Sequence, residues 1–212
     1  MKIDKDRIER RQMKVTAPIE EERDGVMTPI EDDQMIVEGY AVVFDQPQTY
    51  TWGDETYTET INRNALNGAD MRRTVMRYNH NDTVFAMARV KNGSLMMTID
   101  DFGLKIRANL IDTQSNRDLY KMIRTGLVDE MSFAFTVADG GDEWTYSDDF
   151  KTVSREITAI DTVYDVSAVD NGFYETTSIY ARAFDGVDAL KAEAEARRVE
   201  LEKTRALALA QA

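Results

Sequence analysis

Alternation of apolar and polar residues predicts that this chain is built mainly from β-strands. The pattern is clearest in the segment 94–111, SLMMTIDDFGLKIRANLI, which has two alternating halves around a DDFG turn. The apolar positions of the two halves are Leu95, Met97, Ile99, Leu104, Ile106, Ala108 and Leu110. A period of two on both sides of a short turn is typical of a β-hairpin with one buried face.

Other segments have strand patterns of their own. Residues 35–44 are apolar on both faces, which indicates a strand buried on both sides. Residues 127–137 alternate between large apolar and small residues, as expected for a strand with one face in the core. We expect a short strand at 74–82 that ends in a polar turn, an extended segment at 83–90, and two further strands within 152–172.

Helical patterns are fewer. Residues 61–73 predict a short helix that ends near Gly68. Residues 112–126 predict an amphipathic helix, in which Ser115 and Asp118 have the spacing of a capping box.

The segments between and beyond these elements set the expected domain organisation. Residues 45–59 and 138–151 are polar and predict loops, and residues 1–34 are charged and aperiodic, typical of a loose arm. Residues 35–184 would form the folded domain, and 185–212, rich in Ala, Glu, Lys, Arg and Leu, a helical tail. Many strands, few helices and no βαβ alternation favour a mainly β (α+β) fold, an antiparallel β-barrel with flanking helices.

Composition excludes several kinds of site. The formal net charge of -13 argues against a nucleic-acid surface, since contacts with phosphate need Lys and Arg. The absence of cysteine excludes thiol nucleophiles, and one histidine is too few for a His/Cys zinc site. No apolar run approaches the length of a membrane helix. We therefore expect no metal, no cofactor, no nucleic acid and no membrane partner.

The remaining chemistry is that of an activated hydroxyl. A serine needs a neighbouring base, and the imidazole that serves as this base needs a third group to fix its tautomer. His80 is the only imidazole in the chain. Ser132 lies in an apolar strand, and Asp165 is an acid between apolar strand residues, where a carboxylate needs a partner. The residues alone leave open whether these three act together or have separate structural roles.

Several short segments, in order, resemble the caudovirus prohead protease family between Val37 and Arg182. These are VEGYAVVF, ETINRNAL, MRYNHND, NGSLMMTIDDFGLKIRANL, DLYKMIRTGLVDEMSFAF and ITAIDTVYDVSAVDNGFYETTSIYAR. In that family the histidine of the NH motif and the serine of the MSF motif are catalytic, which implies His80 and Ser132. The acid of the [ED]VS motif implies Asp165 as the third member, with Asp161 and Asp170 as alternatives.

The resemblance also implies a fold and a role. The fold would be like that of herpesvirus assemblin, a β-barrel surrounded by helices. The protein would act in the host cytoplasm inside the assembling procapsid, cleaving the scaffold or the scaffolding segment of the major capsid protein, and then itself. Self-association as a dimer or higher assembly is expected. The arm 1–34 could be a removable propeptide.

Two other interpretations stay open at this point. The chain could be a non-catalytic capsid scaffold or assembly protein that retains a protease fold. It could also be a Ser–Lys hydrolase with Lys105 or Lys121 as the base, in which His80 would be dispensable.

Overall fold

The computed structural model describes residues 9–16, 20–23, 26–29, 34–170, 195–196 and 199–200. Its strands and helices follow one another in the order β1 (Glu9–Thr16), β2 (Glu20–Arg23), β3 (Val26–Pro29), β4 (Met35–Val43), β5 (Gln48–Trp52), β6 (Glu55–Ile61), β7 (Val75–Tyr78), β8 (Ala88–Arg89), the 3₁₀ turn η2 (Val90–Asn92), β9 (Leu95–Ile99), β10 (Gly103–Leu110), α1 (Gln114–Arg124), β11 (Glu130–Val137), β12 (Asp142–Tyr146), β13 (Thr152–Ile157) and β14 (Ile160–Val169). The prediction of a mainly β protein is confirmed.

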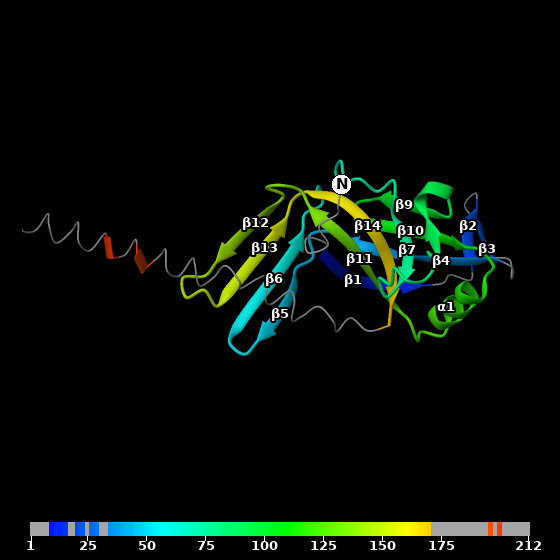
Figure 1. Ribbon diagram of the computed structural model, residues 1–212, viewed down its shortest axis with the longest axis horizontal. Helices are drawn as coiled ribbons and strands as arrows, with labels where there is room; N and C mark the ends of the chain where they lie inside the picture. Colours follow the sequence, from blue (N-terminus) through cyan, green and yellow to red (C-terminus); the bar gives the residue numbers. More distant parts are fainter. Residues whose placement is uncertain are drawn as a thin grey trace, which may run out of the picture. The chain divides into compact units, whose positions relative to one another are not determined.

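The main structure is an eight-stranded sheet in the order β8-β7-β14-β11-β1-β4-β10-β9 (Figure 1). The expected closed barrel is wrong, because in the described part of the chain no ladder joins the end strands β8 and β9. Near these ends, hydrogen bonds to a side chain and not a ladder join Arg89 to Ser94, as when the Arg89 N–H donates to Ser94 Oγ at 2.9 Å. Strand β8 has two residues, too few to carry a closing ladder. A ring of helices is also absent from residues 34–170, where α1 is the only α-helix.

The hairpin at 94–111 is confirmed. Strands β9 and β10 pair antiparallel, with Leu104 opposite Ile99 and Ala108 opposite Leu95. The apolar positions of β10 are fully or almost fully buried. Gly103 begins β10 because a Cβ there would lie 2.0 Å from the Val42 carbonyl oxygen, so only glycine allows the two strands to approach.

The core lies on one face of the sheet. Phe133 and Phe135 of β11 are both fully buried and stack with ring centroids 4.5 Å apart. Helix α1 adds Leu119 and Ile123 to the same core. The N-terminal cap of α1 is Thr113, whose hydroxyl accepts from Asn116 N–H, and not Ser115 as the capping-box spacing predicted.

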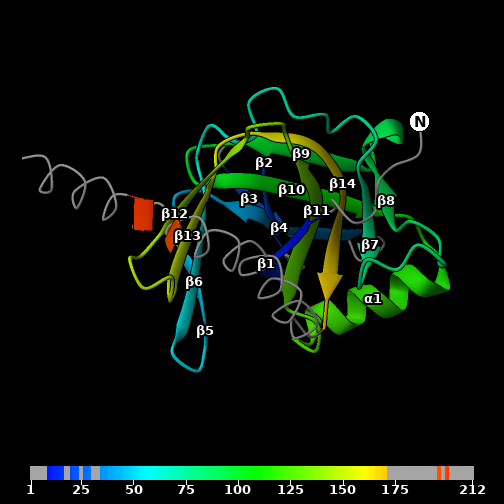
Figure 2. The ribbon, with the colours of Figure 1, turned by 60° about the vertical axis from the view of Figure 1, so that its left-hand side comes forward.

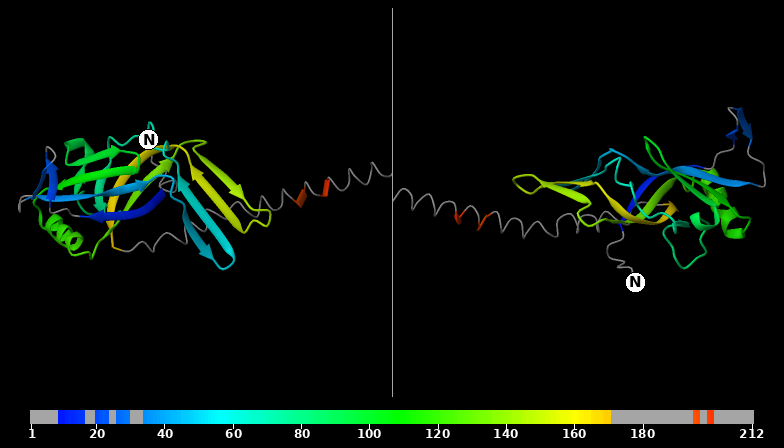
Figure 3. Two further views of the ribbon diagram at one scale, coloured as in Figure 1. Left: turned by 180° about the vertical axis from the view of Figure 1, so that it is seen from behind. Right: turned by 90° about the horizontal axis from the view of Figure 1, so that it is seen from above.

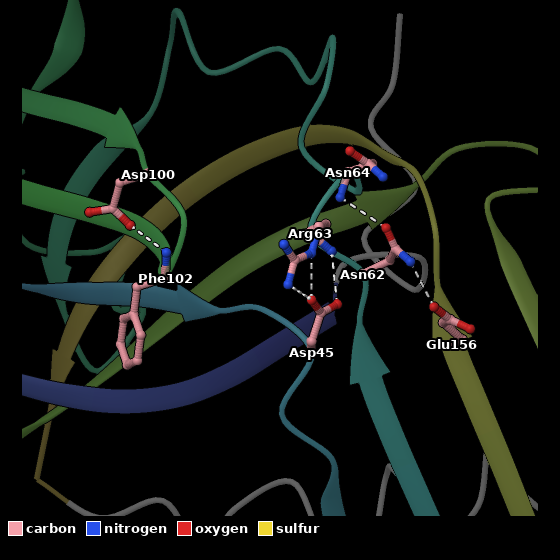
Figure 4. Close-up of polar contacts among 7 residues, drawn as sticks. All are labelled: Asp45, Asn62, Arg63, Asn64, Asp100, Phe102 and Glu156. Carbon is pink, nitrogen blue, oxygen red and sulfur yellow. Dashed lines mark hydrogen bonds and ion pairs between the residues drawn. The ribbon is translucent and has the colours of Figure 1, made fainter.

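The predicted helix at 61–73 is wrong, and the segment forms successive turns. The Asn62 side-chain oxygen accepts from the Asn64 N–H at 2.9 Å, and its amide nitrogen donates to Glu156. Arg63 binds Asp45 beside this turn (Figure 4). Asparagine side chains that capture nearby backbone N–H groups offer the chain an alternative to helix, which explains the difference.

The predicted loops at 45–59 and 138–151 contain strands. Strands β5, β6, β12 and β13 form a second sheet in the order β12-β13-β6-β5. Its aromatic side chains include Tyr57, whose ring centroid lies 6.2 Å from those of both Tyr50 and Trp144, while Arg155 lies 4.9 Å above Trp144. Threonine and tyrosine favour strands despite their polarity, so the prediction of loops from polarity alone was wrong for these segments.

The expected loose arm at 1–34 contains three strands. Strands β2 and β3 pair with each other (Figure 3). Strand β1 pairs with β11 over residues 9–14 and with β4 at Val15 and Thr16, so it joins the two halves of the main sheet. Nothing in the local sequence marks this role, because it depends on partners outside the segment, and β11 lies more than 100 positions away. The predicted helical tail at 185–212 lies outside the described residues, apart from four helical positions.

Candidate active site

His80 lies in a tight turn just after β7. The Asn81 N–H donates to the Tyr78 carbonyl at 3.0 Å, and the two central residues, Asn79 and His80, have φ of 51° and 52°. Two successive positive φ values are those of a type I′ turn, and Asn and His tolerate them better than most residues. The turn returns the chain toward β14, so His80 does not continue the strand direction of β7.

Two neighbouring strands, β11 and β14, supply the other groups. Strand β14 lies between β7 and β11, antiparallel to β11 and parallel to β7 (Figure 2). Ser132 of β11 is directly opposite Ser167 of β14, and Ala134 is directly opposite Asp165. Directly opposed residues share a face, so Ser132, Asp165 and Ser167 all project from the same side of the sheet.

The structure brings His80, Ser132 and Asp165 into direct contact. His80 Nδ1 lies 2.6 Å from Asp165 Oδ1, and His80 Nε2 lies 2.7 Å from Ser132 Oγ. The side chains of His80 and Asp165 are 13% and 11% exposed, and Ser132 is 3% exposed as a residue. The site is therefore shielded from water while the imidazole keeps an opening to solvent.

The hydrogen bonds select one tautomer of a neutral His80. An ionised carboxylate can only accept, so Nδ1 carries the proton that is donated to Asp165. Nε2 then has a free lone pair and accepts the Ser132 O–H. This is the protonation pattern in which an imidazole can remove the proton of a serine hydroxyl.

The alternative acids and bases lie elsewhere. Asp170 accepts from Tyr78 OH at 2.5 Å and from Asn79 Nδ2 at 2.8 Å, and these bonds hold the turn that carries His80, whose Nδ1 bonds Asp165. Asp161 accepts from the hydroxyls of Thr162 and Thr136. Lys105 belongs to β10, which the sheet order separates from β11 by β4 and β1, so a Ser–Lys pair gains no support.

Sequence reasoning missed the residues that support the turn. Tyr78, Asn79 and Asp170 form one hydrogen-bonded group, and Asn79 also bonds β14 through the Ala168 carbonyl at 3.0 Å. The Asp170 carboxylate, through its hydrogen bond, raises the pKa of the Tyr78 phenol, and burial adds to this effect. One signal in the sequence could have indicated them. The residues around His80 are polar, and such a run is expected in a hydrogen-bonded turn and not in a core.

No site for a metal is seen in the described part of the chain, where no three His, Asp or Glu side chains gather to hold one. Among the described residues, none of the helices is long and apolar enough to cross a membrane.

A serine, an imidazole and a carboxylate in this order, joined by two short hydrogen bonds, form the arrangement of Ser–His–acid hydrolases. The model of the caudovirus prohead serine protease family matches residues 24–191. The chain therefore belongs to the caudovirus prohead serine protease family, as its motifs predicted.

The other comparisons are weaker. A search of curated proteins finds no significant match. Among solved structures, the chain is similar to the bacteriophage T4 capsid assembly protease gp21, with 11% sequence identity and a TM-score of 0.46 over 77% of this chain and 97% of that one.

Proposed function

We propose that this protein is a head-maturation serine endopeptidase with His80, Ser132 and Asp165 as its catalytic triad. Its substrates would be the scaffold, or the scaffolding segment of the major capsid protein, and the protease itself. The observation that carries the proposal is the position of His80, with Nδ1 2.6 Å from Asp165 and Nε2 2.7 Å from Ser132, in a member of a serine protease family.

The geometry supports acyl-enzyme chemistry in two steps. Ser132 Oγ attacks the carbonyl carbon of the scissile bond while His80 Nε2 takes its proton. The same Nε2 then gives that proton to the departing amine, which leaves Ser132 as an ester. Water deprotonated by His80 cleaves the ester and restores the hydroxyl, while Asp165 stabilises the imidazolium in each step.

The sheet restricts how a substrate approaches. Strand β11 is paired on one edge with β14 and on the other with β1, so its backbone offers no free edge near Ser132. A substrate peptide would therefore approach Ser132 from the face of the sheet, where His80 lies, and would not extend the sheet as an added strand.

The place of action follows from the family and remains part of the proposal. We infer that the enzyme acts within the assembling procapsid in the host cytoplasm and associates with itself there. Confinement in a shell raises local concentration, which would favour both self-association and cleavage of neighbouring chains.

The proposal is tested with purified chain and the capsid precursor from the same phage. We expect cleavage of the precursor, and we expect a fluorophosphonate probe to modify one serine, located at Ser132 by peptide mass spectrometry. Ser94, a serine outside the site with its own hydrogen-bond partners, should stay unmodified and serves as the internal control. A chain that folds but neither cleaves the precursor nor reacts with the probe would instead be a non-catalytic assembly protein.

A second prediction concerns the turn that carries His80. The Asp170 carboxylate accepts hydrogen bonds from both Tyr78 and Asn79. In Asp170→Asn one of the two oxygens becomes an NH₂, which cannot accept, so one of these bonds is lost. We expect cleavage to fall about tenfold, the equivalent of one hydrogen bond of about 1.4 kcal/mol. Steady-state assays of the variant would measure the loss.

The matched control is Asp100→Asn. Asp100 also accepts a tyrosine hydroxyl, that of Tyr40 at 2.8 Å, in the β9–β10 turn and away from His80. It should lower stability without lowering activity. Equal activity losses in both variants would show that Asp170 has no specific role. The hydrogen bond between Tyr78 and Asp170 should also make stability depend on pH. It raises the pKa of the Tyr78 phenol above 10.0, so its stabilising effect on the fold is complete below pH 10.0 and is lost as the pH rises through the raised pKa.

A further inference from the structure

The proposed mechanism leaves one buried hydroxyl of the site without a role. Ser167 of β14 is fully buried and lies directly opposite Ser132. Its Oγ donates to Asp165 Oδ1 at 2.7 Å and accepts from the backbone N–H of His80 at 3.2 Å. It is thus bonded to two members of the triad at once.

The two bonds act on different degrees of freedom. The first fixes the carboxylate of Asp165, since the same Oδ1 also accepts from His80 Nδ1 at 2.6 Å. The second fixes the backbone of His80, whose φ of 52° is rarely adopted by residues other than glycine. A backbone N–H held in such a turn would otherwise be buried without a partner or would need water.

We propose that Ser167 is the positioning residue of the site, which sets the distance between the Asp165 carboxylate and the His80 ring. This inference rests on the proposed triad. Ser167 is fully buried, so we expect it to act through the two residues that it holds. Because serine can donate one hydrogen bond and accept others, it satisfies both partners where alanine would satisfy neither.

The test uses the single histidine of the chain, which makes its NMR signals unambiguous. In ¹⁵N-histidine-labelled wild type we expect the neutral ring to carry its proton on Nδ1, with a downfield Nδ1–H resonance from the bond to Asp165. In Ser167→Ala we expect a mixture of tautomers and loss or broadening of this resonance. We also expect kcat to fall about 10²-fold with KM nearly unchanged, as for a small misplacement of a catalytic group.

Thr74→Val is the matched control. Thr74, the residue before β7, is also fully buried, and its hydroxyl donates to the Val163 carbonyl of β14 at 2.7 Å and not to a member of the triad. It should lose stability as Ser167→Ala does, but keep the wild-type tautomer and kcat. If Ser167→Ala keeps the wild-type histidine spectrum, or if both variants change kcat equally, the positioning role is wrong.

The readouts separate this inference from the proposed function. The tautomer of His80 is measured without substrate. An inactive wild type would therefore contradict the proposed protease function, while the spectra would still decide whether Ser167 positions His80 and Asp165. Asp165→Asn provides the reference for complete loss of the Nδ1–H···carboxylate bond, and Ser167→Ala should shift the spectrum toward it.

Discussion

His80→Ala and Ser132→Ala are each expected to reduce cleavage of the capsid precursor by about 10⁶-fold, and the double variant should be no slower than either. In the proposed mechanism the two residues share one proton transfer, so removing either partner of the 2.7 Å hydrogen bond would stop the same step. The measurement is the rate of precursor cleavage by the wild type, the two single variants and the double variant at equal concentration.

The fold of these variants should survive, but to different extents. Ser132→Ala removes one hydrogen bond, to the neutral His80 ring, and we expect a change in unfolding free energy below about 1 kcal/mol. His80→Ala leaves Asp165, a mostly buried carboxylate, with the hydroxyl of Ser167 as its remaining site donor and should cost about 1–3 kcal/mol. Chemical denaturation distinguishes the two.

Additive losses would contradict the shared step. If the double variant were slower than each single variant by the product of their effects, His80 and Ser132 would act independently. Full activity of His80→Ala would instead favour a lysine base. Lys121→Ala, a change on the exposed side of α1, tests that alternative. It should abolish cleavage if Lys121 is the base and leave cleavage unchanged if His80 is the base.

The sequence singled out His80 and Ser132, but the residues alone left open whether they act together, and only the family resemblance paired them. One histidine in a polar turn left no second imidazole, and the strand alternation around Ser132 placed it on the face opposite Phe133. The proposed third member, Asp165, was harder to single out from local pattern, because β14 has a register shift beside it, between the pairs Ala134–Asp165 and Phe135–Val163. A shift of this kind changes which acids share a face, so counting by twos could not separate Asp165 from Asp161.

The fold was predictable where local pattern and tertiary environment agree. The β9–β10 hairpin and helix α1 have regular periodicity and lie close together in the sequence. The β5–β6 hairpin was missed because its threonines look polar although they favour strands. Closure of the barrel could not be judged from local pattern at all, since it depends on whether the two-residue strand β8 meets β9.

Strand β1 leads to the second large effect. Deleting residues 1–33 would remove the strand between β11 and β4. Six positions of β11, from Glu130 to Phe135, would lose their partner on this edge and keep only their pairing with β14. Ser132 is one of these positions. We expect a loss of unfolding free energy on the order of 5 kcal/mol, comparable with the whole stability of many domains, and association through the open edge. Thermal denaturation and light scattering measure both.

The control retains β1 and alters only the β2–β3 hairpin. Replacing residues 20–29, which contain this hairpin, by a Gly-Ser linker of equal length should be nearly neutral, because those strands pair only with each other. Adding a synthetic peptide of residues 5–18 to the deleted chain should restore stability if pairing with β11 is the cause. A deletion variant that is as stable and as active as the full chain would show that β1 is dispensable.

Retention of β1 also bears on the arm as a removable propeptide. A cut between Thr16 and Met35 would leave β1 held by its ladder with β11, whereas a cut within β1 would open the sheet beside Ser132. If the arm is processed by the enzyme itself, we therefore expect the mature protein to retain residues 9–16, either covalently or as a bound peptide. Mass spectrometry of the purified mature protein under native and denaturing conditions would distinguish a retained strand from a lost one.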